Sequence, residues 1–253
     1  MEWGKAKSIL IALMLAVNIL LGVNIGVQLY ERHKSQNETA RMACQILLEQ
    51  GVTAGEDMLL TMPDAMIGYI YSRDTAAEEA AASALLGDCL RQEPGGGIYT
   101  YTSQAGELTF RSGGYIELGW QGDDAPDMDG LLSHAGSPEL RTVGTGEGEW
   151  MLYVGSIPVY GASVSGEGGA YSGSWIFGKQ SGTEQQSLSL PAMILAVGRV
   201  MQARGVEKID SVDPAYILSA MQNGDVRLTP VWRVESGRQS FYISVLSGEE
   251  TAF

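Results

Sequence analysis

Side chains able to do chemistry are few in this chain and are poorly placed to work together. Its two histidines, His33 and His134, lie far apart in the sequence. A serine hydrolase needs a serine at a strained strand-to-helix turn and a histidine base beside it. Ser156 instead lies in the segment Val154–Pro158, between two expected strands. We therefore predict a protein that is not an enzyme and has no catalytic residues.

The strongest candidate for a metal site is the acidic stretch over residues 122–130. An EF-hand loop needs alternating acidic ligands before a fixed glycine. Counting back from Gly130, the first ligand position is occupied by Ala125, so the pattern fails. We interpret the stretch as a solvated acidic linker and predict no metal site. Its aspartates are Asp123, Asp124, Asp127 and Asp129.

The sequence also contains a glycine pattern that superficially resembles a phosphate-binding loop, at Gly144, Gly146 and Gly148. Such a loop binds phosphate because it opens a helix whose first amides point at the anion. Here an expected strand follows the glycines. The pattern therefore predicts no nucleotide site, and we expect no cofactor.

The two cysteines are Cys44 and Cys89. Neither lies in a Cys-x-x-Cys pair, and with only two histidines in the chain a Cys/His zinc site is excluded. In an oxidising compartment an even number of cysteines permits one disulfide. The alternative is that both are small buried apolar residues. The sequence leaves these two readings open.

The segment over residues 9–29 is the longest stretch without a charged side chain and contains 21 residues, 13 of them Ile, Leu or Val. A helix of that length spans roughly 30 Å, the thickness of a bilayer core. A cleaved signal peptide has a shorter apolar region of about 7–15 residues and a small-x-small cleavage site. We therefore predict an uncleaved, single-pass transmembrane helix.

The flanks of this segment set its expected orientation. Trp3, Lys5 and Lys7 precede it within a short tail over residues 1–8. Cytoplasmic flanks of membrane helices are rich in Lys and Arg. Arg32 and Lys34 on the other side weigh against this, but a short tail is the easier end to leave inside. We expect a cytoplasmic N-terminus and an extracytoplasmic bulk in the cell membrane.

Asn18, Gly22 and Gly26 are spaced four residues apart and so share one face of the expected membrane helix. Small residues at this spacing let two membrane helices approach closely, and an asparagine can hydrogen-bond across the contact. The alternative is an ordinary anchor, because glycine is common in membrane helices. The sequence does not decide between a packing face and a plain anchor.

Charge restricts the partners of the remaining chain. The net charge is −14, and residues 1–34 hold four Lys or Arg against two Asp or Glu, so residues 35–253 carry −16. Nucleic-acid binding needs a basic surface that neutralises phosphates. We therefore exclude nucleic acid as a partner. So acidic a body is also not expected to lie flat on an anionic membrane.

Hydrophobic periodicity and turn residues predict an α+β fold with two small extracytoplasmic domains of antiparallel sheet and packed helices, over 30–121 and 131–253, joined by the linker 122–130. Trp232, Phe241 and Tyr242 belong to core positions or to an exposed patch, and we favour the core. Expected helices cover 35–50, 75–90, 129–136 and 191–203. Expected strands cover 66–71, 98–103, 107–111, 115–120, 149–154, 158–164, 173–177, 208–212, 225–234 and 239–246.

The N-terminal sequence Met1-Glu-Trp-Gly-Lys-Ala-Lys-Ser-Ile9, which runs directly into the apolar segment, resembles the start of the YycI family. The C-terminal third is also similar, with a proline-started helix followed by Leu228–Trp232 and by Phe241 and Tyr242. The glycine-rich middle and the cysteines depart from the family.

The resemblance implies a single-pass accessory regulator of a sensor histidine kinase that controls cell-wall metabolism. It further implies contacts with that kinase and with a paralogous YycH-like single-pass protein, and no catalytic residues. The competing interpretation is an anchored extracellular enzyme or a cell-wall-binding protein. A deep pocket with convergent polar groups would favour the competing interpretation. A third interpretation is an assembly component of a secretion or sporulation apparatus.

Overall fold

The structure is a computed structural model that describes residues 14, 18, 21, 38, 41–55, 66–133, 140–146, 148–184 and 187–252. It is a sheet-dominated α+β fold with mainly antiparallel pairing, in agreement with the predicted class. An unlabelled helix covers 41–49, and the labelled helices are α3 (Thr75–Leu86), α4 (Met128–Leu132) and α5 (Leu190–Ala203). The strands are β1 (Gly68–Arg73), β2 (Leu90–Gly95), β3 (Ile98–Thr102), β4 (Gly106–Phe110), β5 (Tyr115–Trp120), β6 (Leu140–Gly144), β7 (Glu149–Val154), β8 (Ile157–Glu167), β9 (Ala170–Ser174), β10 (Gly178–Glu184), β11 (Ser211–Ala220), β12 (Val226–Ser236) and β13 (Gln239–Ser244).

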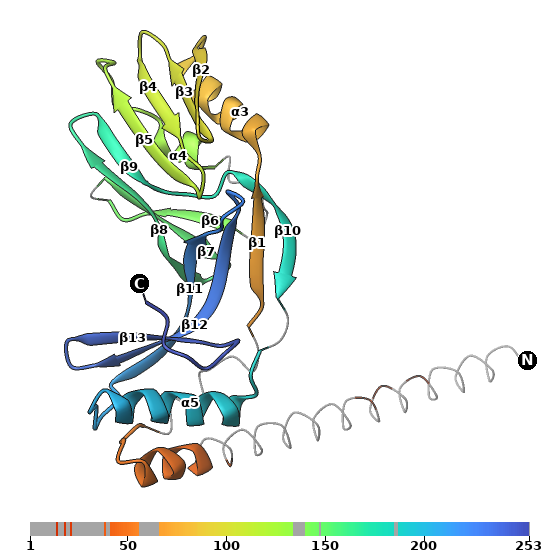
Figure 1. Cartoon of the computed structure of the whole chain (residues 1–253), viewed down its shortest axis with the longest axis vertical. Helices are drawn as coiled ribbons and strands as arrows, with labels where there is room; N and C mark the ends of the chain where they lie inside the picture. Colours follow the sequence, from red (N-terminus) through yellow and green to blue (C-terminus); the bar gives the residue numbers. More distant parts are fainter. Residues whose placement is uncertain are drawn as a thin grey trace, which may run out of the picture.

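The strands form an upper sheet, made of β2–β9, and a lower sheet, made of β1 and β10–β13 (Figure 1). Strand β8 belongs to both sheets. Its last residues pair with β9, whereas Val159 and Tyr160 pair in parallel with Tyr216 and Ile217 of β11. A long strand that changes partner along its length joins the two sheets into one hydrogen-bonded path.

Three strand pairings cross the predicted linker over 122–130. Strand β5 pairs with β9, and β1 pairs with both β10 and β12. One continuous hydrophobic core also extends from Leu47 through Leu108 in the upper sheet to Trp232 in the lower sheet. The linker therefore does not separate two independently paired sheets. Side-chain periodicity reveals strands, but it carries no information about which distant strand each one pairs with.

One strand prediction within the lower sheet needs correction. The strand expected over 208–212 is instead β11, which begins at Ser211 and runs to Ala220. Pro214 hides it, because proline lacks the amide that a central strand needs. In the structure Pro214 pairs with Trp232, but β8 pairs with β11 only at Tyr216 and Ile217. Pro214 therefore lies in a part of β11 that pairs with β12 on one side and with no strand on the other, so its missing amide breaks no strand pairing.

Pro230 in β12 has a similar position. Strand β1 pairs with β12 only up to Leu228, and β13 begins to pair at Val231. The proline thus marks the point where β12 exchanges one neighbour for another. Strands β2, β6 and β10 were not predicted at all, because they are rich in glycine, charged or polar residues and lack a two-residue hydrophobic period.

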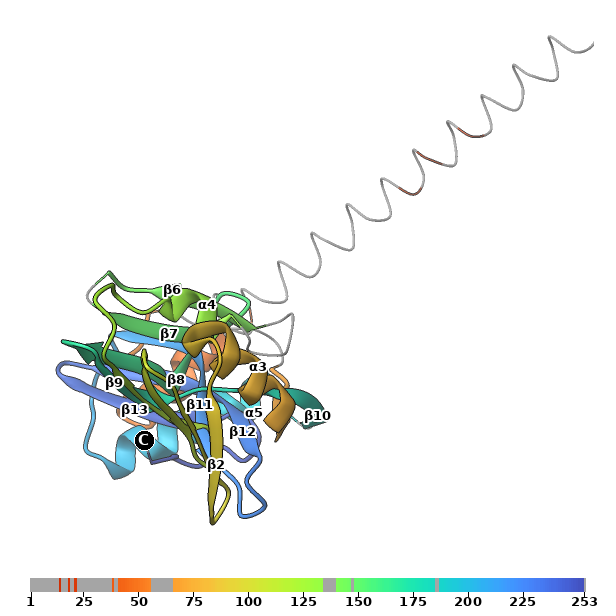
Figure 2. The same cartoon turned by 90° about the horizontal axis from the view of Figure 1, so that it is seen from above.

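Helices cover the fold in two places. Helices α3 and α4 lie beside each other on the upper sheet (Figures 1 and 2). At the opposite end, α5 lies against the lower sheet, and the helix over 41–49 lies under α5. A Cβ atom on Gly198 would lie 3.1 Å from Leu47 and would collide with the Gln50 side chain. Glycine at this position therefore allows the two helices to pack closely.

Of the residues predicted to span a membrane, only Met14, Asn18 and Leu21 are described, and all three are helical. No helix among the described residues is long and apolar enough to cross a membrane. The rest of the segment 9–29 lies outside the described residues.

Candidate functional site at the junction of the two sheets

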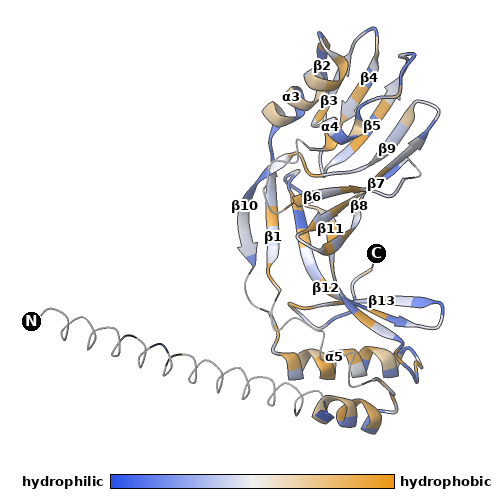
Figure 3. Ribbon diagram, turned by 180° about the vertical axis from the view of Figure 1, so that it is seen from behind, coloured by the Kyte–Doolittle hydropathy of each residue, from blue (hydrophilic) through white to orange (hydrophobic). Residues whose placement is uncertain are grey.

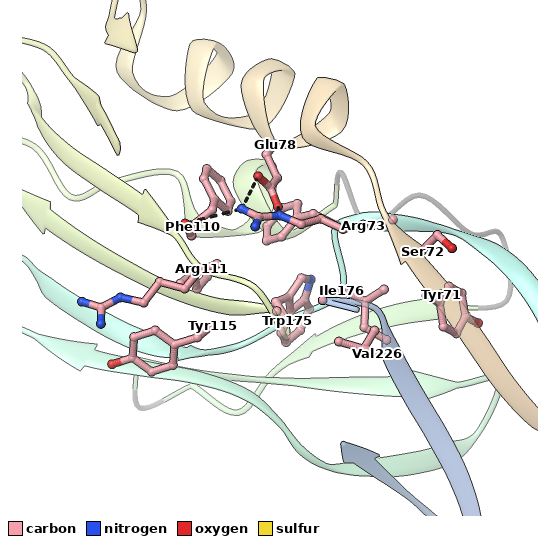
Figure 4. A pocket seen from close by; sticks show the side chains of 15 residues that line it. Tyr71, Ser72, Arg73, Glu78, Phe110, Arg111, Tyr115, Trp175, Ile176 and Val226 are labelled. Atoms are coloured by element: carbon pink, nitrogen blue, oxygen red, sulfur yellow. Dashed lines mark hydrogen bonds and ion pairs between the residues drawn. The ribbon is translucent and has the colours of Figure 1, made fainter. Parts of the chain in front are cut away.

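A partly enclosed pocket lies where the upper and lower sheets meet (Figure 4). Four segments converge there from distant parts of the sequence. They are the connection from β1 to α3, the turn 112–114 between β4 and β5, the segment 175–177 after β9, and the tip of the β11–β12 hairpin at 221–225.

An ion pair between Arg73 and Glu78 forms one wall of the pocket. The guanidinium binds the carboxylate through two nitrogens, with Nε 2.6 Å from Oε1 and Nη2 2.9 Å from Oε2. The side chain of Glu78 is 4% exposed and that of Arg73 is 16% exposed. Arg73 also donates to the carbonyl of Gly97 and, over 3.5 Å, to that of Phe110. The planar fork of arginine suits such bidentate binding.

Local sequence explains why this pair forms at the start of α3. Asp74 caps the helix, and its carboxylate accepts hydrogen bonds from the amides of Ala76 and Ala77. Lys179 of β10 lies 2.9 Å from the same carboxylate. The cap fixes the first turn of α3, and this turn places Glu78 back over Arg73 at the end of β1.

Two consecutive glycines, Gly113 and Gly114, bring the turn after β4 into the junction. Their φ angles are +80° and +85°, a region that favours glycine. The amide of Gly113 donates to the carbonyl of Gly224, and Trp175 donates to that of Gly114. A Cβ on Gly114 would lie 2.3 Å from the carbonyl oxygen of Trp175. A larger residue at Gly114 would therefore collide with the backbone that follows β9, the neighbouring strand of the upper sheet.

Aromatic packing closes the rest of the junction. Phe110 meets Phe177 edge-on with ring centres 5.0 Å apart and Tyr101 with ring centres 5.8 Å apart. The indole of buried Trp175 donates to the carbonyl of Leu132, which ends α4. Contacts of this geometry add to the stability gained from burial alone.

The junction pocket has little room for a ligand. Its cavity volume is about 20 Å³, roughly what a single water molecule requires. Burial raises the pKa of Glu78, and the neighbouring Arg73 opposes that rise. Because the two charges already satisfy each other, the arrangement is suited to holding two sheets together rather than to binding a substrate.

A second, open depression lies on the outer face of β4, β5 and β9. Arg111 and Glu117 form an ion pair there, 3.1 Å apart, with side chains 50% and 54% exposed. Glu107, Thr109 and Ser172 complete the polar surface. This shallow groove offers polar contacts along three strands.

The acidic segment 122–130 has a more specific structure than a solvated linker. Asp127 caps α4 and accepts a hydrogen bond from the amide of Gly130 over 2.8 Å. Asp129 accepts one from the indole of Trp150 over 2.8 Å, and the carbonyl of Asp124 accepts one from Trp120. No group of acidic, histidine or cysteine residues in the described ranges is arranged to hold a metal ion.

No disulfide joins the two cysteines. Cys44 lies on the helix over 41–49, and its thiol is 3.5 Å from the carbonyl of Ala54. Cys89 lies between α3 and β2, at the other end of the molecule (Figure 1). The sequence predicted that both cysteines lie in helices of one small domain. Cys44 does lie in a helix, whereas Cys89 lies beyond the end of α3.

The other predicted site residues divide between core and undescribed positions. Trp232 and Phe241 are buried, as predicted, whereas Tyr242 points to the other face of β13 and packs against Tyr160. Asn18 is helical and exposed. The residues Trp3, Lys5, Lys7, Gly22, Gly26, His33 and His134 lie outside the described residues.

The Arg73–Glu78 pair was not predicted from the sequence. One signal was present, since a strand, a capping aspartate and a helix follow one another with an arginine and a glutamate five residues apart. That signal does not reveal burial, because the carbonyls that Arg73 binds belong to Gly97 and Phe110, 24 and 37 residues away in sequence.

No protein-family model matches the chain, and no curated protein does. Among solved structures, the chain is similar to an uncharacterized protein from Eubacterium rectale, with 12% identity and a TM-score of 0.37, over 76% of this chain and 86% of that one. It is also similar to the C-terminal domain of Bacillus megaterium YpeB, with 10% identity and a TM-score of 0.34, over 71% of this chain and 96% of that one. Neither likeness carries a functional inference.

Proposed function

We propose that this protein is a membrane-anchored accessory regulator of a sensor histidine kinase that controls cell-wall metabolism. The observation that carries the proposal is the N-terminal pattern over residues 1–9, followed by the charge-free segment 9–29 and a large acidic body. In this proposal the N-terminus is cytoplasmic, and the described sheets lie outside the cell. The partners are the kinase and a paralogous YycH-like single-pass protein.

The junction supports a protein that acts through contacts. The junction pocket has about 20 Å³ of space, and its buried charges pair with each other. A site for a small molecule is usually a far larger apolar cleft of ~300–1,000 Å³ with a few convergent polar groups. The fold therefore offers surfaces and edges to a partner more readily than it offers a reaction chamber.

Regulation needs only a difference in affinity between two kinase conformations. A subunit that binds one conformation more tightly shifts the equilibrium toward it, and coupling of roughly 1–3 kcal/mol is typical. The face formed by Asn18, Gly22 and Gly26 would contact helices of the kinase within the membrane. One interhelical hydrogen bond contributes about 0.6 kcal/mol on average, so the outer sheets must supply most of the binding.

The competing function is binding of a cell-wall polymer. The observation in its favour is the open polar groove over β4, β5 and β9, which contains Arg111 and Glu117. An extended chain could lie along such a groove. This alternative needs the same membrane anchor but a different partner.

Crosslinking in native membranes, followed by purification and mass spectrometry, separates these functions. Recovery of a histidine kinase together with a similar single-pass protein is the expected result. Recovery of wall polymer without a kinase contradicts the proposal and favours the groove.

A matched pair of variants tests the membrane contact. Gly22→Leu with Gly26→Leu places bulk on the proposed packing face, and Val23→Leu changes a neighbouring face by one methylene group. We expect the double variant to insert normally but to change kinase output, and the control to leave output unchanged. Equal output from both variants would remove the membrane contact from the proposal.

A further inference from the structure

The open edges of the two sheets differ in how well they are protected against pairing with a further strand. Proteins protect an exposed edge with proline, charged residues, bulges or a covering segment. Strand β2 contains Pro94 and an irregular register beside it. The free part of β11 contains Pro214, and the residues after β13 hydrogen-bond along its outer side. Strand β10 has an irregular register and only glycine and polar side chains, and Figure 3 shows it in the shades of hydrophilic residues.

Strand β6, near the rim of the molecule, is less protected (Figure 2). Within the described residues it pairs with β7 alone, through five consecutive residues and without a register shift. It contains no proline and a single charged residue, Arg141. The apolar side chain of Val143 is 40% exposed. The outer edge of β6 can therefore accept another strand.

The hydrogen-bond pattern shows which backbone groups of β6 point outward. The amide of Thr145 donates to the carbonyl of Glu149, so these two opposed residues form a hydrogen-bonded pair. Hydrogen-bonded and non-hydrogen-bonded pairs alternate along antiparallel strands. The residues whose N–H and C=O groups point away from β7 are therefore Leu140, Thr142 and Gly144. No hydrogen bond among the described residues uses these outward groups.

We propose that β6 pairs with β6 of a second copy of this chain, antiparallel and across a two-fold axis at Thr142, so that the upper sheets of two copies join. In this register Leu140 lies opposite Gly144 of the second copy. All three outward-pointing residues then take part, and each opposed pair exchanges two hydrogen bonds. An axis at Arg141 or Val143 would use only two of the three. The inference goes beyond the proposed function and does not depend on it.

The side chains suit the same register. Arg141 lies opposite Val143 of the second copy, so no like charges face each other across the axis. The exposed valine also gains contact with the apolar stem of that arginine. Two threonines meet at the axis, which is a favourable cross-strand pair. An axis at Arg141 would instead bring two guanidinium groups together.

The test traps the contact as a disulfide in the purified full-length chain in detergent. Cys44→Ser and Cys89→Ser remove the native thiols, and a single cysteine is introduced by Thr142→Cys or, as the control, by Val143→Cys. In the proposed register the two copies of residue 142 have Cα atoms about 5.5 Å apart, which a disulfide spans. The two copies of residue 143 are diagonal neighbours roughly 7–8 Å apart, at or beyond the limit of about 7 Å. Diamide serves as the oxidant and takes up two electrons and two protons for each disulfide.

We expect the disulfide-linked dimer to form at least about fivefold faster with Thr142→Cys than with Val143→Cys, because only residue 142 lies within disulfide reach of its copy. Random collisions would give the opposite order, since residue 143 is the more exposed. Charge gives a second check in the Thr142→Cys background. Val143→Lys would face Arg141 of the second copy and should slow crosslinking severalfold, whereas Val143→Glu should preserve or speed it.

Equal or faster crosslinking at residue 143 overturns the inference, and so does the absence of a dimer at residue 142. Equal effects of Val143→Lys and Val143→Glu overturn it as well. The same oxidation in native membranes adds a further outcome: crosslinking of residue 142 to a different protein alone would assign the edge to that protein and overturn the inference. Dimer formation without kinase recovery rejects the proposed function alone, and kinase recovery without a dimer rejects this inference alone.

Discussion

The buried pair Arg73–Glu78 gives the sharpest prediction about stability. Arg73→Met removes the cation but preserves most of the side-chain bulk, and it leaves the carboxylate of Glu78, 4% exposed, without its partner. Removing one member of a buried ion pair destabilises proteins by roughly 3–5 kcal/mol. For a chain of this size each kcal/mol lowers the melting temperature by roughly 2–4 °C, so the expected loss is about 6–20 °C.

The matched control is Arg111→Met. Arg111 forms an ion pair of comparable length with Glu117, but both side chains are about half exposed. Solvent screens such a pair, whose contribution is about 0–1 kcal/mol. The measurement is thermal unfolding of the purified full-length chain in detergent, followed by near-ultraviolet circular dichroism. If Arg73→Met is no more harmful than Arg111→Met, the junction does not depend on the buried pair and the reasoning is refuted.

A double variant separates the loss of a contact from the exposure of a buried charge. Replacing both residues, with Arg73→Met and Glu78→Leu, removes the unpaired carboxylate. Buried pairs can often be replaced by apolar residues of similar volume with little loss. We expect the double variant to recover most of the stability that Arg73→Met loses. A double variant less stable than Arg73→Met would show that the pair contributes more than mutual compensation.

Three further predictions concern pH, the helix cap and the junction glycines. Burial raises the pKa of Glu78 and Arg73 opposes that rise, and a carboxyl whose pKa is raised in the folded state favours folding when it is protonated. In Arg73→Met the opposing cation is gone, so the loss of stability relative to the parent protein should shrink as the pH falls from 7 toward 4.5 in parallel melting curves. A loss that does not change with pH counts against a buried charge. Asp74→Ala should lower the free energy of unfolding in urea by about 0.5–2 kcal/mol. Lys179 and the cap amides lower the pKa of Asp74 from 3.8, so the stabilisation by this carboxylate is present above pH 3.8 and is lost as the pH falls through the lowered pKa. If Asp74→Ala still destabilised the protein in acid, the cap assignment would be contradicted. Gly114→Ala, at φ +85° and against the carbonyl of Trp175, should lower the free energy of unfolding by at least about 2 kcal/mol. Its control Gly237→Ala, at φ +61° with open space around the new Cβ, should lower it by about 1 kcal/mol. Equal losses would argue against the close approach at Gly114.

Local sequence predicted those parts of the fold whose signals are themselves local. β5 and β7 were predicted at the observed residues, and α3 and α5 begin within one residue of the predicted start. Each has either a clear hydrophobic period or a recognisable capping residue. Helix α3 ends at Leu86, earlier than predicted, because Gly87 adopts φ +70° and Cys89 already leads into β2.

Partner choice between strands was not predictable in the same way. Strand β8 serves two sheets, and β12 exchanges β1 for β13 at Pro230. The β8–β11 pairing joins residues 57 positions apart and the β1–β12 pairing joins residues more than 150 positions apart, and no local period encodes such partners. The apparent linker over 122–130 was misleading for the same reason, since its aspartates are used to cap α4 and to bind two tryptophans.

The junction shows why its principal residues escape recognition in sequence. An arginine at a strand end and a glutamate in the first turn of a helix are ordinary surface residues, and the macrodipole favours the acid there. They become buried only because the turns at 95–97 and 112–114 fold over them, and both turns depend on glycines with positive φ. The pair and the glycines therefore depend on each other. Replacing a glycine should expose the pair. The pair should then contribute no more to the free energy of unfolding than the exposed pair Arg111–Glu117 does. A double-mutant cycle on Arg73 and Glu78 in the Gly114→Ala background measures this dependence, and an unchanged coupling energy there would show that the pair is buried independently of the turn.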